Sequence, residues 1–198
     1  NLFVWRLGTD SVAQLTQTLA AGMDAAHLVQ SSIERFKSFD GLEIPGLLYK
    51  PKQASSSNKV PGIIWIHGGP GGQTRQGYSA MMQHLVNHGY AVFGVNNRGS
   101  SGYGKTFYHL DDKRHGEDDL QDIVYGKKYL QSLDWIDGDK IVVMGGSYGG
   151  YLTMAAVCAS TSLLMTIIPE RVDLASASQF LTMASGVLEV LYSNGGIG

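Results

Sequence analysis

The sequence predicts an α/β fold in which a mostly parallel sheet carries helices on its faces. Three short apolar runs, rich in β-branched residues, are typical of buried strands: residues 60–66, 91–95 and 141–144. Helix-like stretches separate these runs, and strands that alternate with helices indicate β-α-β units with parallel pairing. The 198 residues, 43% of them hydrophobic, are enough to form one sizeable core.

Two helices are expected to connect these strands. The first covers about residues 79–87, with Gly89 as its C-terminal cap. The second covers about residues 117–133, where apolar side chains recur near helical spacing. It begins with three acidic residues, which we interpret as a solvated first turn favoured by the helix dipole: Glu117, Asp118 and Asp119.

A glycine-flanked serine follows the third strand-like run. Residues 145–149 read Gly-Gly-Ser-Tyr-Gly, and the apolar stretch 151–158 after them is typical of a buried helix. This arrangement fits G-x-S-x-G, the strand-to-helix turn on which hydrolases mount a nucleophile. Such a serine needs a strained backbone, so side chains just before and after it are expected to clash. The alternative is a tight β–α turn with an incidental serine.

Two backbone groups are candidates for an oxyanion hole beside Ser147. One is the N–H of Tyr148, which lies at the expected helix N-terminus. The other belongs to the loop that follows residues 60–66, where His67 precedes Gly68 and Gly69. No Gly-Lys-Ser/Thr follows this loop, which argues against a phosphate-binding P-loop.

Three side chains are candidates for the substrate pocket: His67, Arg98 and Tyr103. His67 sits beside the oxyanion loop, so we expect it to orient that loop rather than to act as the catalytic base. Arg98 and Tyr103 lie on a loop at the carboxyl end of a strand, where open α/β sheets bind ligands. A structural ion pair is an equally good role for Arg98.

Three motifs occur in a characteristic order. They are His-Gly-Gly-Pro at residues 67–70, Asn-Arg-Gly-Ser-Ser-Gly-Tyr-Gly at 97–104 and Gly-Gly-Ser-Tyr-Gly-Gly-Tyr at 145–151. This combination resembles the prolyl oligopeptidase family of serine peptidases, nearest its acylaminoacyl-peptidase branch. The resemblance extends to residues 36–51, which look like the hairpin that opens the family's catalytic domain. Residues 171–180 look like the next sheet strand and its loop.

The resemblance implies an α/β-hydrolase fold and hydrolysis of short peptides, with Ser147 as the nucleophile and no cofactor. It also implies a domain boundary near residue 30. Apolar and polar residues alternate weakly within residues 1–30, with a turn between two strand-like runs, as at the end of a β-propeller blade with its linker. Residues 31–198 look like the catalytic domain. The alternative for the first segment is a hairpin packed on the hydrolase itself.

The acid and base of a catalytic triad are missing after the serine. In this fold the triad runs Ser, Asp or Glu, then His, yet all six histidines precede Ser147: His27, His67, His84, His88, His109 and His115. We interpret Asp173 and Glu189 as structural residues. By resemblance the acid and base are expected beyond residue 198, so the sheet is expected to be C-terminally incomplete, with an open edge near residues 172–174.

Composition excludes several classes of partner. A net charge of −2 supplies no basic field for nucleic acid or an anionic membrane, and no apolar run reaches transmembrane length. The histidines lack metal-ligand spacing, since His84 and His88 have no Glu between them. We expect a small peptide or acyl substrate and a cytoplasmic location, and a homo-oligomer stays open. No signal peptide begins the chain, although a start lost upstream would have removed one.

Two other functions stay open beside the serine peptidase. The first is a non-catalytic α/β-hydrolase-like module that binds a partner or ligand without turnover, which the missing acid and base favour. The second is a small carboxylesterase that recruits an unusual base, His109 or His115.

Overall fold

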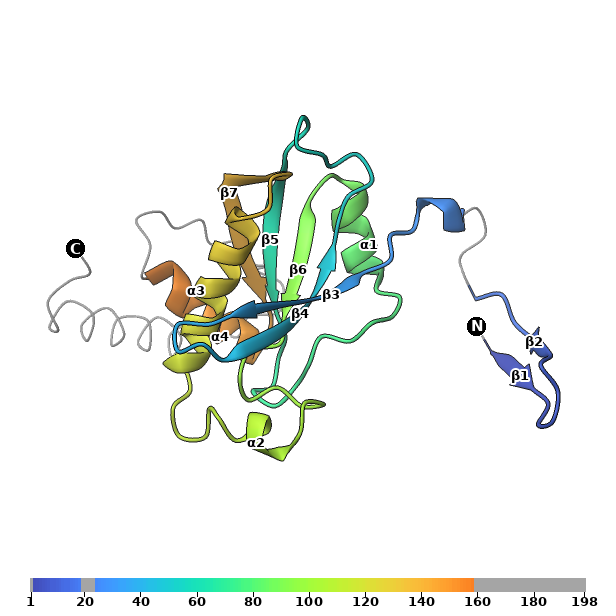
Figure 1. The fold of residues 1–198 in the computed structure, drawn as a ribbon, viewed down its shortest axis with the longest axis horizontal. Helices are drawn as coiled ribbons and strands as arrows, with labels where there is room; N and C mark the ends of the chain where they lie inside the picture. The colour runs from blue at the N-terminus through green and yellow to red at the C-terminus, as the bar shows by residue number, and fades with distance from the viewer. Residues whose placement is uncertain (1, 19–23, 159–198) are drawn as a thin grey trace, which may run out of the picture.

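The computed structural model describes residues 2–18 and 24–158 (Figure 1). The strand expected within residues 171–180, with Asp173, and the expected helical position of Glu189 lie outside these ranges, as does the predicted open edge near residues 172–174.

A five-stranded mixed sheet forms the centre of the molecule, in the order β3-β4-β6-β5-β7. Its strands are β3 (Ser32–Lys37), β4 (Glu43–Tyr49), β5 (Val60–Ile66), β6 (Ala91–Val95) and β7 (Ile136–Gly145). β5 pairs in parallel with both β6 and β7, whereas the β3-β4 hairpin joins β6 in antiparallel pairing. The predicted α/β class and parallel strands are confirmed, and the hairpin makes the sheet mixed.

Helices cover both faces of this sheet, as Figure 1 shows. The described residues form four α-helices, α1 (Ala80–Asn87), α2 (Lys105–Tyr108), α3 (Asp118–Gln131) and α4 (Tyr148–Cys158), and one short 3-10 helix at Ala25–His27. Met82 and Val86 of α1 pack with Ile63 and Val92 on one face. On the other face, α3 and α4 pack on a larger cluster that includes Ile64, Phe93, Ile123, Leu130 and Leu152. Among the described helices, none is long and apolar enough to cross a membrane.

The ends of α1 follow directly from its sequence. Ser79 is the N-cap, and its side chain accepts a hydrogen bond from the Met82 N–H at 3.4 Å. His88 is the C-cap, and Gly89 follows it at φ +92°, in the left-handed region that favours glycine. The predicted helix is confirmed, but its C-cap is His88 and the predicted glycine, Gly89, is the left-handed residue directly after the cap.

β7 is longer than the sequence pattern predicts. Its first residue, Ile136, pairs with Val60, and after a shift in register residues 141–145 pair with residues 62–66. The residues between these two segments, 137–140, read Asp-Gly-Asp-Lys. They interrupt the apolar run, which is why the pattern indicated only residues 141–144.

The N-terminal segment forms a small sheet of its own. β1 (Phe3–Trp5) pairs antiparallel with β2 (Val12–Gln14), as the alternating pattern predicted. Figure 1 shows this hairpin apart from the five-stranded sheet. Trp5 and Leu7 are 59% and 84% exposed, so these side chains do not pack on the five-stranded sheet.

The sheet and α3 meet around one aromatic ring. Phe93 of β6 is fully buried, and the rings of Phe36 and Tyr129 lie 5.9 and 5.3 Å from it. Gly46 of β4 faces the same ring: a Cβ at this position would stand 2.5 Å from Cε2 of Phe93. The hairpin can therefore lie close to β6 only because residue 46 has no side chain.

We expect Gly46→Ala to lower the free energy of unfolding by about 1–3 kcal/mol, because the buried ring has little room to move. Urea denaturation followed by circular dichroism measures this. Gly138→Ala is the matched strand control, since its new Cβ would meet nothing closer than 3.5 Å. Equal stability of the two variants would contradict the packing described for Phe93.

Candidate active site

Ser147 occupies a strained turn between β7 and α4. Its φ is +56°, a value that residues other than glycine seldom adopt. β7 ends at Gly145 and α4 begins at Tyr148, so only two residues separate the strand from the helix. The Tyr151 N–H donates to the Ser147 carbonyl oxygen at 3.1 Å, which links the turn to the first turn of the helix. Backbone strain of this kind clusters at functional sites.

Two glycines let this turn pack against the end of β5. A Cβ on Gly145 would stand 2.5 Å from the carbonyl carbon of Gly149, and one on Gly149 would overlap the Ile66 carbonyl oxygen. At Gly146, directly before the serine, a Cβ would meet no atom of the described residues within 4 Å. The expected steric clash therefore arises two residues before and two after Ser147, because these are the positions that contact the neighbouring strand.

The loop after β5 reaches the same place. A Cβ on Gly68 would lie 3.4 Å from the Cβ and 3.9 Å from the Oγ of Ser147. Gly69 has φ +153°, and a Cβ there would stand 2.5 Å from the Gly72 nitrogen. β5 and β7 are parallel neighbours, so their carboxyl ends share one sheet edge, and this brings the glycine loop to the serine.

His67 is buried between two loops. Its Nδ1 lies 2.8 Å from the Gly68 carbonyl oxygen, and its Nε2 lies 2.8 Å from the Ser100 Oγ. The side chain is 6% exposed, and burial lowers the pKa of the imidazole, which favours its neutral form. Both ring nitrogens are engaged, so His67 ties the glycine loop to the loop after β6.

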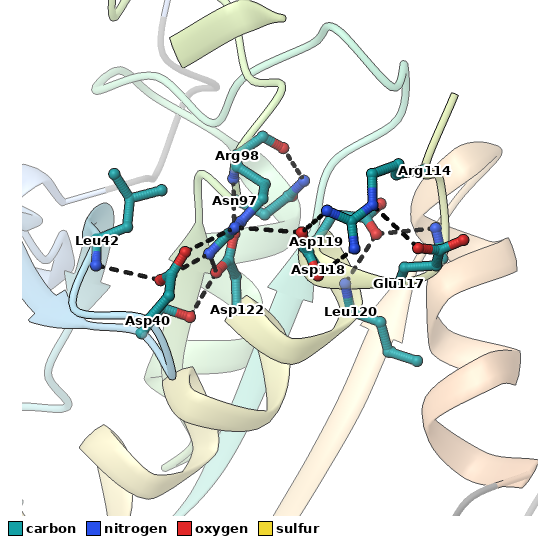
Figure 2. A network of polar contacts seen from close by, with 12 residues as sticks. Asp40, Leu42, Asn97, Arg98, Arg114, Glu117, Asp118, Asp119, Leu120 and Asp122 are labelled. Atoms are coloured by element: carbon teal, nitrogen blue, oxygen red, sulfur yellow. Dashed lines mark hydrogen bonds and ion pairs between the residues drawn. The ribbon is translucent and has the colours of Figure 1, made fainter. Parts of the chain in front are cut away.

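Arg98 is the centre of a buried ion network (Figure 2). Its Nε and Nη2 lie 3.0 and 2.9 Å from the two carboxylate oxygens of Asp122 on α3. Nη1 and Nη2 bond to Asp40 at 3.0 and 3.1 Å, and Nη1 lies 3.6 Å from Asp118. Of the two roles expected for Arg98, the structure shows the ion pair. The pocket role does not fit, because the residue is 4% exposed and its guanidinium is held by carboxylates.

The charges in this network reinforce one another. Burial opposes the charge on Arg98, but hydrogen bonds to Asp122 and Asp40 outweigh it and raise the pKa of the guanidinium. The same bonds hold the pKa of Asp40 below its usual value. Burial raises the pKa of Asp122, and the hydrogen bonds from Arg98 and Ser38 oppose this shift. The network joins the loop after β6 to α3 and to the β3-β4 turn.

Asp119 holds the residue that follows the serine. It is fully buried, and its Oδ1 accepts hydrogen bonds from the N–H groups of Gly116 and Leu120 at 2.8 and 2.9 Å. The phenol of Tyr148 donates to its Oδ2. Burial, and next the bond to Asp119, raise the pKa of Tyr148, so the phenol keeps its proton. The interpretation of residue 119 as part of a solvated first turn is wrong.

The sequence contained a signal for this burial. Asp119 and Asp122 belong to the stripe of α3 that faces the sheet, at the spacing of three and four residues shared by its buried members Ile123, Gly126 and Leu130. Charge alone suggested solvent exposure. Position on the apolar stripe would have predicted the buried carboxylates.

Tyr103 lies at the rim of the same sheet edge. It is 36% exposed, its hydroxyl accepts a hydrogen bond from Asn96 Nδ2 at 2.7 Å, and its ring meets the edge of Phe107 at 5.4 Å. The structure thus brings the Gly68 loop and Ser147 together, buries His67 and Arg98 behind them, and leaves Tyr103 partly open to solvent.

Comparison with known proteins assigns this fold and sequence to a family. A profile of the prolyl oligopeptidase family matches residues 76–171. Dipeptidyl aminopeptidase BIII of Pseudoxanthomonas mexicana is 29% identical over an alignment of 189 residues, and the match covers 89% of this chain and 26% of that protein. The uncomplexed acylaminoacyl peptidase of Pyrococcus horikoshii is 36% identical with a TM-score of 0.61, and the match covers 67% of this chain and 21% of that one.

A puromycin-hydrolyzing peptidase of Mycobacterium tuberculosis is 25% identical with a TM-score of 0.71, and the match covers 77% of this chain and 24% of that one. These likenesses identify the fold as that of the α/β hydrolases. The chain belongs to the prolyl oligopeptidase family. It spans about a quarter of the length of these three relatives.

We expect Asp122→Ala to lower the free energy of unfolding by about 3–5 kcal/mol, since it leaves the Arg98 guanidinium buried without its main partner. Chemical denaturation of the purified variants measures this. Glu43→Ala is the control, because it breaks the exposed Arg35–Glu43 pair and is expected to cost less than about 1 kcal/mol. Similar losses in both variants would show that the Arg98 network does not stabilise the fold.

Proposed function

We propose that this chain carries the nucleophile and oxyanion hole of a serine peptidase. The observation that carries the proposal is the positive φ of Ser147 in a turn packed beside Gly68. A serine held in this way presents its Oγ to the sheet edge, where ligands bind in open α/β folds. Membership of a peptidase family supports the same role.

The proposed chemistry is acyl transfer. The Ser147 Oγ attacks the carbonyl carbon of the scissile bond while a base takes its proton, and the oxygen of that carbonyl becomes an oxyanion. The N–H groups of Tyr148 and of the loop at Gly68 and Gly69 stabilise this charge. The proton then passes to the leaving amine as the C–N bond breaks, and water releases the acyl group by the reverse route.

Asp119 contributes by positioning. Its bond to the Tyr148 phenol holds the first residue of α4, and the N–H of a first helical residue has no acceptor within the helix. An oxyanion donor must be fixed before the reaction, and loss of one donor lowers kcat by roughly 10²–10³-fold. The ordering of Tyr148 by a buried carboxylate supports the assignment of its N–H as one such donor.

The remaining parts of the site are proposed to lie outside residues 1–198. The fold places the acid and then the histidine after the nucleophile, and no histidine follows Ser147 here. We assign residues 31–198 to the catalytic domain and residues 1–30 to the end of a preceding β-propeller blade with its linker. The exposed apolar faces of β1 and β2 support that boundary.

Short peptides with a free or acylated N-terminus are the proposed substrates. The names of the relatives describe a dipeptidyl aminopeptidase, an acylaminoacyl peptidase and a puromycin-hydrolyzing peptidase. Tyr103, partly exposed at the sheet edge, is the remaining candidate for the pocket wall.

Ser147 should react with a fluorophosphonate probe in the product of the complete reading frame, and Ser147→Ala should abolish the labelling because no other serine shares its turn. In-gel fluorescence with peptide mapping measures this. Ser132→Ala, an exposed hydroxyl at the end of α3, is the control and should label as the wild type does. Labelling that persists in the alanine variant would remove Ser147 from the mechanism.

Residues 1–198 alone should hydrolyse p-nitrophenyl esters far more slowly than the product of the complete reading frame, because an oxyanion hole without a base retains only some 10³–10⁴-fold acceleration over water. A spectrophotometric assay checks this. Strong turnover, lost on His109→Ala or His115→Ala, would instead identify the chain as an esterase with an unusual base.

A further inference from the structure

A cluster of three metal-ligating side chains lies behind Tyr148. Asp111, His115 and Asp119 each offer one ligand atom, and these atoms all lie within 4.8 Å of one another. Asp111 is 2% exposed and Asp119 is fully buried, whereas the His115 side chain is 41% exposed. The three residues are spaced four apart. Histidine spacing alone did not indicate this set, since two of its members are carboxylates.

One buried oxygen in this cluster has no hydrogen bond. Within the part of the chain that the structure describes, Oδ2 of Asp111 accepts none, and it faces Nδ1 of His115 at 3.3 Å. The Asp111 carboxyl group lies against Gly99, where any Cβ would overlap it, so residue 99 offers no side-chain donor. A buried carboxylate oxygen without a hydrogen bond is costly, and a bound cation would offset this cost more directly than the 3.3 Å contact with His115.

We propose that Asp111, His115 and Asp119 bind one divalent transition-metal ion, with Zn²⁺ as the best match. One imidazole nitrogen and two carboxylate oxygens form a ligand set that zinc accepts, and imidazole disfavours Mg²⁺ or Ca²⁺. The 3.3 Å between Nδ1 and Oδ2 is close to the edge of a tetrahedron with metal–ligand bonds of about 2.0–2.1 Å. The exposed side of His115 gives the ion a route from solvent.

The position of the cluster gives the ion a consequence for Tyr148. Asp119 accepts the Tyr148 phenol, and the His115 ring meets the Tyr148 ring edge-on at 5.5 Å. An ion that fixes both ligands also fixes the residue next to Ser147. This consequence rests on the proposed function, but the binding of the ion does not.

Isothermal titration of the purified protein with ZnCl₂ tests the site. His88→Ala is made first as the background, because the exposed His84 and His88 rings lie 4.1 Å apart and form a second place for zinc. In this background we expect one zinc per chain. Adding His115→Ala should weaken zinc binding by at least about tenfold. Removal of a residue that only hydrogen-bonds to a metal ligand already lowers metal affinity by about 10–100-fold, and His115 is itself a proposed ligand. Asp111→Asn should do the same.

His109→Ala is the matched control, because His109 pairs with Asp112 in an exposed i, i+3 contact that has no third ligand among the described residues, and zinc affinity should not change. Circular dichroism checks that each variant is folded, and Co²⁺ absorption reports tetrahedral coordination. No zinc binding in the background protein, or unchanged affinity after His115→Ala, overturns the proposal. Ser147→Ala should bind zinc normally, so failure of the metal site and failure of the proposed nucleophile are separable.

Discussion

The bidentate ion pair between Arg98 and Asp122 is the interaction on which the geometry of the site depends. It fixes the loop after β6 against α3, and through Asp40 it also fixes the turn of the β3-β4 hairpin. Once α3 is held, its first turn presents Asp119 to Tyr148. A buried ion pair adds little net stability over apolar packing, but removing one partner is strongly destabilising because the other charge stays buried. Some buried ion pairs also select one conformation of the chain over its alternatives. Here that conformation extends to the residue beside Ser147.

The second constraint is steric. The turn at Ser147 packs so closely against the end of β5 that Gly145 and Gly149 have no room for a side chain. Parallel pairing of β5 with β7 creates this proximity, and the glycines make it tolerable. Packing thus positions the glycine loop and the serine together, before any ligand arrives. This is how a rigid scaffold organises backbone donors without the reorganisation that water would need.

The sequence predicted the parts of the fold that local patterns determine. Apolar runs indicated β5 and β6, capping residues indicated α1, and the G-x-S-x-G motif indicated the turn at Ser147. Prediction failed where partners come from distant segments. The polar residues 137–140 hid the start of β7, and the acidic start of α3 suggested solvent although Asp119 is buried. A carboxylate can be buried when folding brings an arginine or a phenol from a distant segment next to it. The local periodicity of the sequence does not contain this information.

The left-handed backbone at Ser147 also bears on how such a chain evolves. A non-glycine residue held there costs on the order of 1–3 kcal/mol, a noticeable part of the stability of a small domain. Glycine would occupy the position without strain, so selection for stability alone favours its loss. The serine at φ +56° therefore lowers the folding stability of its own chain. In a gene copy that is no longer selected for activity, this serine should be substituted early, while the residues of the surrounding fold are kept.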